Sequence, residues 1–572
     1  MPGPVRGEPG VLRGLSATPA SVEDQPLKFG IMCRGTSFPA WQARAVEELL
    51  KLPGVDAGLL ILGSRPSGED RARRFIGRRD KLWTLYNRTY VAKRSRAARR
   101  VDMSDTLEGI PAIECSVREE GYSEYFSDED VERIQGYDLD FILRFGFGII
   151  RGEILEAARY GVWSFHHDDE QKYRGSPPCF HEIRTGDPVT GSILQRLTER
   201  LDGGIVLQKG WFRTIDHSYV RNRDEAYFGS AGWPARVCRE MRSGAATYLE
   251  DEPTSSEARI FRNPGNVRTA MFLAKLAKNF VRSQLRGLFR ADTWGVGIAR
   301  MPIEVFLEEM PAIDWLPGPG GTRYVADPFG IQKGEETAIL VEDFDYTTRR
   351  GTISVFEPPV TRPVLPMEVH ASYPYTFEHA GEIYCVPEIE KSRRVVLFRA
   401  VRFPGEWEEA AVLLEDVPAL DPTVFRHGGR WWLFCAEPDP AQNARLFAWH
   451  AADLAGPYQE HAANPLKVDI RSTRPAGTPF LHKGVLYRPA QDRSRTYGGA
   501  VAINRVETLT PDEFREEVVR VVGPDPLGPF PDGLHTISSV GAVTLVDGKR
   551  SGFIAPGFRH ELGSRARKLF RS

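Results

Sequence analysis

The sequence has few cysteines, six in 572 residues, and no two of them form a Cys-x-x-Cys pair. Such scatter argues against a zinc knuckle or a disulfide framework and fits a reducing compartment. Apolar runs long enough to span a bilayer are lacking, as is the apolar core of a secretory signal. The formal net charge is only −2, which gives no overall attraction to nucleic acid. We therefore expect a cytoplasmic protein with no metal site and no nucleic-acid partner.

The chain is long enough for several domains, and its 41% hydrophobic and 27% charged residues are ordinary for a globular protein. Residues 1–26 are rich in Gly, Pro and charge, and predict a disordered tail. Residues 559–572 predict a basic tail. From residue 27 onward a strand, a helix and a second strand succeed one another, which indicates a βαβ unit and a largely parallel sheet. We take this α/β domain to be residues 27–215.

The most informative stretch lies between residues 160 and 210. A short apolar run leads to His166, and Asp202 follows on a glycine-rich segment. A histidine at a strand end and a loop carboxylate can form an oriented acid–base pair. Because alternate side chains of a strand share a face, Ser164 and His166 should point the same way. By spacing alone, a solvated or structural histidine is the more frequent case.

Four motifs in this stretch follow a familiar order: Ser-Phe-His at 164–166, Tyr-Arg-Gly-Ser-Pro at 173–177, Gly-Asp-Pro-Val-Thr-Gly at 186–191 and Asp-Gly-Gly at 202–204. Together they resemble the folate-dependent formyltransferases, the family of methionyl-tRNA, glycinamide ribonucleotide and sugar-amine formyltransferases. The resemblance implies a Rossmann-type fold, 10-formyltetrahydrofolate as cofactor and an amine as acceptor. It also implies catalytic roles for His166, the acid–base and oxyanion group, and for Asp202, its partner. Ser164 stands where the family has asparagine.

The resemblance further implies a folate pocket. Phe147, Gly148 and Ile149 match the loop whose backbone holds the pterin ring, and Gly203 is a further cofactor-binding candidate. Arg174 is a candidate for substrate binding. The glycines of this loop miss the G-x-G-x-x-G spacing of a dinucleotide site. An ordinary turn at the sheet edge is the alternative reading of the loop.

Residues 216–292 predict a connecting region that contains a basic amphipathic helix. One face of this helix collects the cations Arg268, Lys275, Lys278, Arg282, Arg286 and Arg290, and the other collects Phe272, Leu273, Leu276, Phe280, Val281 and Leu288. Such a helix can lie on an anionic surface, so residues 268–290 are a candidate for peripheral membrane contact. A helix that bridges two domains with solvated cations is the alternative, and the pattern favours it.

Residues 293–558 contain an internal repeat whose copies start near residues 324, 372, 419, 473 and 535. The first four copies have a proline, a strand, a glycine turn and a second strand, and the fifth is degenerate. Repeats of this kind indicate propeller blades, and their number favours five. The region resembles the five-bladed propellers of arabinanase-like glycosidases and, more closely, the propeller of plant glucosamine inositolphosphorylceramide transferases. This implies that Asp327 and Asp421 point into a central funnel that could bind a glycan.

Glycosidase chemistry needs two carboxyls that flank the scissile bond, and Glu388 and Glu437 are poor matches for the general acid. The Asp-Pro pairs that begin at Asp327 and Asp421 also have a structural explanation, because Asp-Pro favours a turn. The sequence thus predicts a formyltransferase-like α/β sheet followed by an all-β five-bladed propeller. The predicted activity is formyl transfer to an amino sugar or glycoconjugate that the propeller recognises. A hydrolase or another acyl transferase that uses His166 and Asp202, and a non-catalytic carbohydrate-binding protein, are the alternatives.

Overall fold

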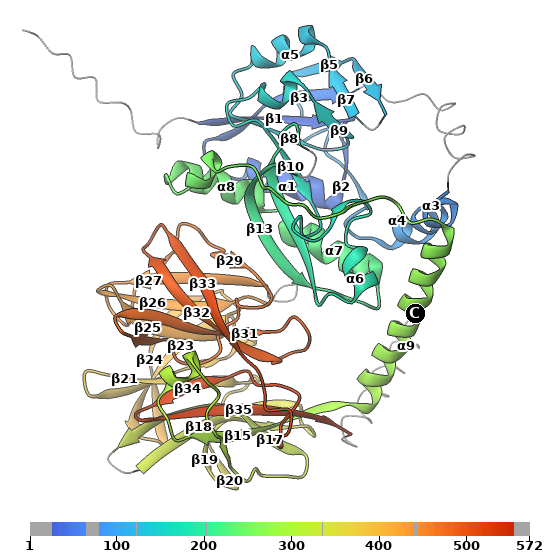
Figure 1. Ribbon diagram of the computed structural model, residues 1–572. Coiled ribbons are helices and arrows are strands. Elements are labelled where there is room, and N and C mark those ends of the chain that lie inside the picture. The colour runs from blue at the N-terminus through green and yellow to red at the C-terminus, as the bar shows by residue number, and fades with distance from the viewer. Residues whose placement is uncertain are drawn as a thin grey trace, which may run out of the picture.

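The computed structural model describes residues 26–63, 79–121, 123–200, 203–333, 336–438 and 444–553. Asp202, all but one residue of the predicted N-terminal tail and the whole predicted C-terminal tail lie outside these ranges. The chain forms an α/β half followed by an all-β half, joined by a long helix (Figure 1). Within the described residues, no helix is long and apolar enough to cross a membrane.

A seven-stranded sheet organises the α/β half, in the order β13-β12-β10-β8-β1-β3-β5. Its strands are β1 (Leu27–Cys33), β3 (Val55–Gly63), β5 (Ala112–Cys115), β8 (Phe141–Arg144), β10 (Val162–His166), β12 (Val189–Arg196) and β13 (Ile205–Arg213). The five strands from β10 to β5 are parallel. β12 runs antiparallel to them, and β13, antiparallel to β12, runs in their direction again. The sheet is therefore largely parallel, as the strand–helix–strand spacing predicts.

Both faces of the sheet are covered, because successive side chains of a strand point to opposite faces. Phe141 and Leu143 of β8 belong to one apolar core, while Ile142 between them belongs to the other. Helices α1 (Ala40–Leu50), α7 (Tyr219–Ser230) and α8 (Trp233–Arg242) contribute to the first core, and α5 (Asp128–Gln135) and η3 (Glu153–Glu156) to the second.

Short elements complete this half. They are β2 (Ser37–Pro39), α3 (Lys81–Tyr86), η2 (Asn87–Val91), α4 (Ala92–Arg94), β4 (Arg100–Asp102), β6 (Val117–Glu120), β7 (Ser123–Phe126), β9 (Ile149–Arg151), β11 (Arg174–Gly175), α6 (His181–Thr185), η4 (Thr247–Glu250) and β14 (Ile260–Phe261). Helix α9 (Asn266–Phe289) then runs down the side of the molecule to the all-β half (Figure 1).

Five antiparallel sheets make up the all-β half. Four of them follow the chain: β17 (Arg323–Lys333) to β20 (Val360–Leu365), β21 (Ser372–His379) to β24 (Glu406–Glu415), β25 (Leu420–His427) to β29 (Lys467–Val468), and β30 (Phe480–His482) to β33 (Phe514–Val522). Their inner strands are β18 (Glu336–Asp345), β19 (Arg350–Glu357), β22 (Glu382–Glu388), β23 (Arg394–Arg402), β26 (Arg430–Ala436), β27 (Arg445–Ala451), β28 (Gln459–Glu460), β31 (Val485–Asp492) and β32 (Ala500–Leu509). The 3-10 turns η5 (Ile303–Leu307) and η6 (Glu390–Ser392) lie between strands.

The fifth sheet joins the two ends of this half. Strands β15 (Ala291–Ala299) and β16 (Asp314–Trp315) come from its start, and β34 (Ile537–Val540) and β35 (Val543–Gly552) from its end. β15 pairs with β35 along all nine of its residues. The sequence repeats correspond to one hairpin in each of the five sheets: β17–β18, β21–β22, β25–β26, β30–β31 and β34–β35. That the sheets close into a five-bladed propeller stays a prediction.

The same backbone irregularity recurs in the first strand of three sheets. Asp327, Tyr373 and Asp421 have positive φ angles of 48°, 47° and 50°, and the strand register shifts at each of them. A non-glycine residue in this region is strained and persists only where its surroundings hold it. Here the bulges bring side chains of different sheets together: Tyr373 Oη lies 3.0 Å from Thr423 Oγ1, and Thr536 Oγ1 donates to Asp327 over 2.8 Å.

The two halves share a contact surface. Arg471 lies over the ring of Trp211 at 4.2 Å, and Ile470 N donates to the Trp211 carbonyl oxygen over 2.9 Å. Val468 and Ile470 belong to the same apolar core as the seven-stranded sheet. The halves are therefore packed together by buried apolar side chains as well as joined by α9.

Candidate active site

A cavity of about 850 Å³ lies at the carboxyl ends of β8 and β10. Ser164 and His166 enter it from the end of β10, Phe147 and Gly148 from the loop after β8, and Ile149 from the start of β9. The carboxyl ends of parallel strands meet at one edge of a sheet, where α/β proteins bind ligands. Five residues that the sequence singles out therefore line one cavity.

Arg144, the last residue of β8, ties these parts together. Its Nε donates to Ser164 Oγ over 3.2 Å, and its guanidinium also donates to the carbonyl oxygens of Phe147, over 3.2 Å, and Gly148. The arginine therefore fixes the loop after β8 and brings a positive charge beside Ser164. The sequence reasoning did not find Arg144, because no motif marks it.

His166 is partly buried, and its Nε2 lies 3.3 Å from the carbonyl oxygen of Tyr173. A carbonyl can only accept, so Nε2 carries the hydrogen in this hydrogen bond and a further proton would go to Nδ1. The neighbouring His167 points the other way, into the core, where its Nε2 lies 3.2 Å from Ser230 Oγ. Burial above all, and the nearby His166 and Arg223, lower the pKa of His167 well below its usual value.

Besides the end of β10 and the loop after β8, the segment that joins the sheet to α9 lines the cavity. Strands β11 and β14 pair here, with Gly175 opposite Phe261. A Cβ on Gly175 would come within 2.2 Å of the Phe261 carbonyl oxygen, and its φ is +90°, so only glycine fits. Ile260, Phe261, Arg262 and Asn263 line the cavity as a result. Local sequence patterns gave no signal for this long-range pairing.

Other predicted residues lie behind the cavity wall. Arg174 is buried, and its guanidinium donates to the Ser256 carbonyl oxygen over 3.2 Å. Gly203 accepts from Thr198 Oγ1 over 2.9 Å, and Thr198 itself lines the cavity. Asp202 lies outside the described residues, so its pairing with His166 stays a prediction.

Positive charge dominates the described wall of the cavity. Its cationic residues are Arg79, Arg144, Arg200 and Arg262, and its acidic residues are Asp80 and Glu199. Such a wall favours ligands that carry carboxylate or phosphate groups, since arginine pairs well with both.

A buried carboxyl lies on α6, outside this cavity. Burial raises the pKa of Glu182 to about 8, and the nearby carboxylates of Asp187 and Asp169 add to the rise. Glu182 is therefore mostly protonated at neutral pH. Glu182 does not line the cavity.

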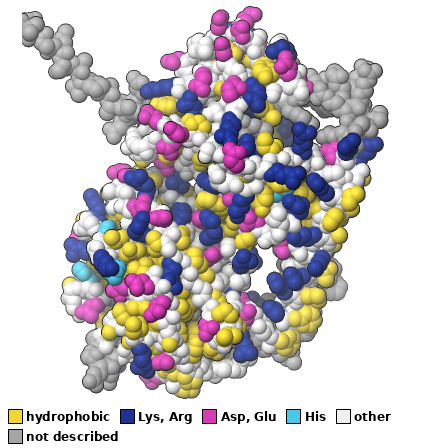
Figure 2. All heavy atoms as spheres, in the orientation of Figure 1, with side chains coloured by type: hydrophobic (Ala, Val, Ile, Leu, Met, Phe, Trp, Pro, Cys, Tyr) yellow, Lys and Arg dark blue, Asp and Glu magenta, His cyan; other side chains and the backbone are white. Residues whose placement is uncertain are grey.

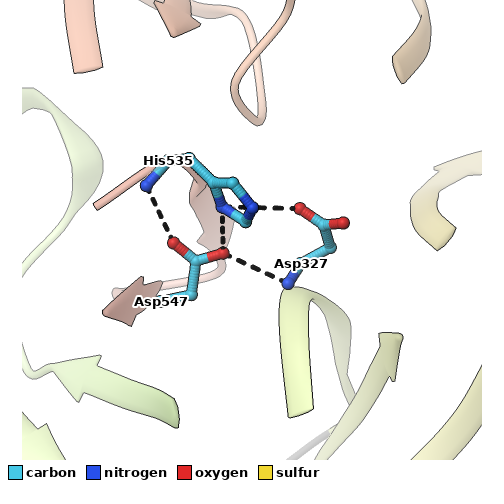
Figure 3. A group of neighbouring side chains, drawn as sticks. All are labelled: Asp327, His535 and Asp547. Carbon is cyan, nitrogen blue, oxygen red and sulfur yellow. Dashed lines mark hydrogen bonds and ion pairs between the residues drawn. The ribbon is translucent and has the colours of Figure 1, made fainter. Parts of the chain in front are cut away.

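A second polar cluster lies in the all-β half (Figure 3). His535 Nδ1 lies 2.5 Å from Asp547 and 3.7 Å from Asp327. Asp547 also accepts from the backbone N–H groups of His535, Thr536 and Asp327, at 2.9, 3.0 and 3.2 Å. Burial lowers the pKa of His535, but the two carboxylates outweigh it and the pKa is raised. Asp327, whose pKa burial raises to about 6, completes this ion pair.

The ligand atoms of Asp327, His535 and Asp547 lie within 4.8 Å of one another, so among the described residues this group could hold a metal ion. The chemistry of the three favours an internal ion pair instead. His535 Nδ1 already lies 2.5 Å from Asp547, and both oxygens of Asp547 accept hydrogen bonds from the backbone.

Asp421 is held in a similar way. Arg474 donates to both of its oxygens over 2.5 and 2.8 Å, and Gln491 donates over 2.7 Å. Arg474 also pairs with Glu388 at 3.1 Å. Burial would raise the pKa of Asp421, but Arg474 lowers it overall. Asp327 and Asp421 thus sit in buried ionic networks, and their binding of a glycan stays a prediction.

Comparison with known proteins finds two kinds of relative. Residues 319–525 match the family described as "Glucosamine inositolphosphorylceramide transferase 1, N-terminal". The protein of that name from Oryza sativa subsp. japonica is 35% identical over 219 residues, which are 36% of this chain and 29% of that protein. The chain thus spans less than a third of that relative. Methionyl-tRNA formyltransferase of Caulobacter sp. (strain K31) is 38% identical over 127 residues, 22% of this chain and 41% of that enzyme.

Solved structures give the same two kinds of likeness. Glycinamide ribonucleotide transformylase 1 from Symbiobacterium toebii has a TM-score of 0.26 and 16% identity, covering 38% of this chain and 88% of that one. A thermostable family-43 glycoside hydrolase has a TM-score of 0.29 and 14% identity, covering 38% and 84%. At these scores the two structures carry no further argument. By sequence, the chain is homologous to methionyl-tRNA formyltransferase and to plant glucosamine inositolphosphorylceramide transferase 1.

Proposed function

We propose that the protein transfers a formyl group from 10-formyltetrahydrofolate to the amine of an amino sugar or glycoconjugate. The observation that carries the proposal is the cavity of about 850 Å³ that Ser164, His166 and the 147–149 loop line together. Its volume falls within the range of small-molecule sites, roughly 300–1,000 Å³. The identity of 38% with a methionyl-tRNA formyltransferase over 127 residues supports the same chemistry.

The lining residues fit a reduced folate. The loop at Phe147, Gly148 and Ile149 offers backbone groups and apolar side chains for a flat ring, and Phe261 faces the same cavity from β14. Arg200 and Arg262 suit the carboxylates at the other end of such a molecule. The cofactor would supply the formyl carbon.

We assign proton transfer and stabilisation of the developing negative charge to residues of the chain itself. His166 would take a proton at Nδ1, because Nε2 already donates to the Tyr173 carbonyl. Arg144 and Ser164 would direct donors at the negative charge that develops on the formyl oxygen. Donors arranged in advance in a site of low water content are worth about 10²–10³ in rate each. Asp202, as the partner of His166, would help this proton transfer by stabilising the protonated ring.

We assign recognition of the acceptor to residues 293–558, as a five-bladed propeller. The plant relative is named for a glucosamine and a ceramide-linked inositol phosphate, which supports a sugar amine or a glycolipid as acceptor. We do not extend sugar transfer to this chain. The matching family covers the N-terminal part of that transferase, and the chain spans 29% of its length.

Calorimetry of the full chain with 5-formyltetrahydrofolate, a stable analogue, tests the cofactor. We expect binding, and we expect Ile149→Trp, which would fill the cavity, to abolish it. Val360→Trp, an exposed site on β20 in the other half, is the matched control. Absence of binding by the folded protein at millimolar ligand would contradict the proposed function.

A panel of amino sugars with 10-formyltetrahydrofolate then tests the acceptor, with product read by mass. Amine-dependent formylation supports transfer. Release of formate without an amine would favour the alternative of a hydrolase on the same site.

A further inference from the structure

Against the described part of the chain, helix α9 packs one narrow face. Phe272 is buried, 6.1 Å from the Trp83 ring of α3, and Thr269 and Asn279 are buried along the same side. Asn279 donates to the Asp216 carbonyl oxygen over 3.0 Å. The apolar face predicted from the sequence is therefore only partly used, and most of the helix surface faces outward.

The outward surface carries a second apolar row that the sequence reasoning did not separate. Val267, Met271, Val281 and Leu285 are exposed to 74%, 69%, 55% and 50%. At 100° per residue, these four positions lie within about 80° of arc. Large apolar side chains this exposed, aligned along one helix, mark an interaction surface rather than chance exposure.

Cations border this row. Arg268, Lys275, Arg282 and Arg286 fall on one flank of it, and Lys278 lies within it. No Asp or Glu occurs in Asn266–Phe289. Within the described part of the chain, none of Arg268, Lys278, Arg282 and Arg286 forms an ion pair with a carboxylate.

The neighbouring elements extend the basic surface. Next to α9, the stretch from α3 to β4 exposes Lys93, Arg94, Arg96 and Arg99, together with the apolar Leu85 and Tyr90. In Figure 2, cationic and apolar side chains lie side by side along α9. We call the exposed residues of α9 and of the stretch 85–99 the α9 surface.

We propose that the α9 surface binds an anionic lipid membrane, with α9 lying in the plane of the headgroups. An amphipathic helix with an apolar row and flanking Lys and Arg binds in this way, because lipid tails bury the row while acidic headgroups neutralise the cations. A second copy of the chain fits less well: a two-fold contact would bring the same patch onto itself and oppose like charges. This proposal is independent of the chemistry of the cavity.

Vesicle co-sedimentation of the full chain tests the proposal. We expect binding to phosphatidylcholine vesicles that contain phosphatidylserine and much weaker binding to phosphatidylcholine alone. Each Lys or Arg near the surface contributes about 1 kcal/mol, so Lys278→Gln with Arg282→Gln should weaken binding about 25-fold. Met271→Ser with Leu285→Ser should weaken it as well, and higher salt should reproduce the effect of the charge variants.

Matched controls lie in the all-β half. Arg426→Gln and Val360→Ser remove an exposed cation and an exposed apolar side chain there, and should leave vesicle binding unchanged. Circular dichroism checks that every variant is folded. Wild type that stays unbound with anionic vesicles overturns the proposal. So does equal loss in the controls, or sedimentation equilibrium showing a dimer that the α9 variants dissociate.

Discussion

Arg144 Nε and Ser164 Oγ lie 3.2 Å apart, across the ends of two neighbouring parallel strands. The formyltransferase motif has the longer asparagine side chain at the position of Ser164. Ser164 has a shorter side chain, and the guanidinium of Arg144 lies beside its hydroxyl. A charged donor makes stronger hydrogen bonds to an anionic oxygen than a neutral amide does. Under the proposed function, the two residues together would supply the donors that the asparagine supplies in the resembled family.

The first prediction follows from this pair. Arg144→Met should lower kcat of formyl transfer by about 10²–10³, since one donor to the developing charge is lost. Ser164→Asn alone should also lower kcat, because its amide crowds the guanidinium. The double variant should recover part of the loss. The measurement is kcat beside the dissociation constant for 5-formyltetrahydrofolate. Unchanged kcat in Arg144→Met would rule out its role.

The second prediction concerns His166. His166→Ala should abolish turnover while the protein stays folded, because a partly buried side chain at the cavity rim adds little to the core. His482→Ala, in β30 of the other half, is the matched control and should retain full activity. Turnover and thermal unfolding of both variants decide the matter. Persistent activity in His166→Ala would remove the catalytic claim for the α/β half.

The local sequence pattern explains why part of the candidate site, Ser164 and His166, could be predicted. Ser164 and His166 lie in a strand whose apolar pattern is plain, and the period of two indicates that they share a face. The loop at 147–149 is singled out by its resemblance to the formyltransferases. Arg144 could not be found this way. It ends a strand, no motif contains it, and its contact with Ser164 exists only because β8 and β10 are neighbours in the sheet. The wall at β14 depends on a pairing with β11 across the chain.

The all-β half and α9 show the same limit: a sequence pattern predicts local structure but not contacts between distant segments. Each hairpin of the repeat is local, so the sequence predicts it, whereas the pairing of β15 with β35 joins residues far apart in the chain. For α9, periodicity indicated one apolar face. Only the packing shows that Phe272 faces inward while Met271, one position earlier, is exposed.

The third prediction concerns the buried arginine of the all-β half. Arg474 pairs with Asp421 and Glu388, and all three are buried. Arg474→Met should destabilise the protein by about 3–5 kcal/mol, because it leaves uncompensated carboxyl groups in the core. Arg426→Met removes an exposed arginine and should have little effect. Urea unfolding of the two variants is the measurement. Similar midpoints for both would show that the network is not needed for stability.

The fourth prediction uses the raised pKa of Glu182, about 8 because of burial. Between the ordinary value of a glutamate and pH 8, the folded protein holds a proton that the unfolded chain releases. The folded state thus binds more protons, and its stability falls as pH rises through this window. Glu182→Gln stays neutral at every pH and keeps a hydrogen-bond donor. In this variant, the part of the fall in stability that Glu182 causes should therefore disappear.

Thermal unfolding of wild type and Glu182→Gln between about pH 6 and pH 9 measures the difference. The variant should gain in melting temperature relative to wild type as pH rises, and the gain should level off above pH 8. Asp327, whose raised pKa is about 6, titrates in both proteins and cancels in the comparison. Glu129→Gln, an exposed position on α5, should show the pH dependence of wild type. Parallel curves for all three proteins would mean that Glu182 is already ionised in the folded state at neutral pH.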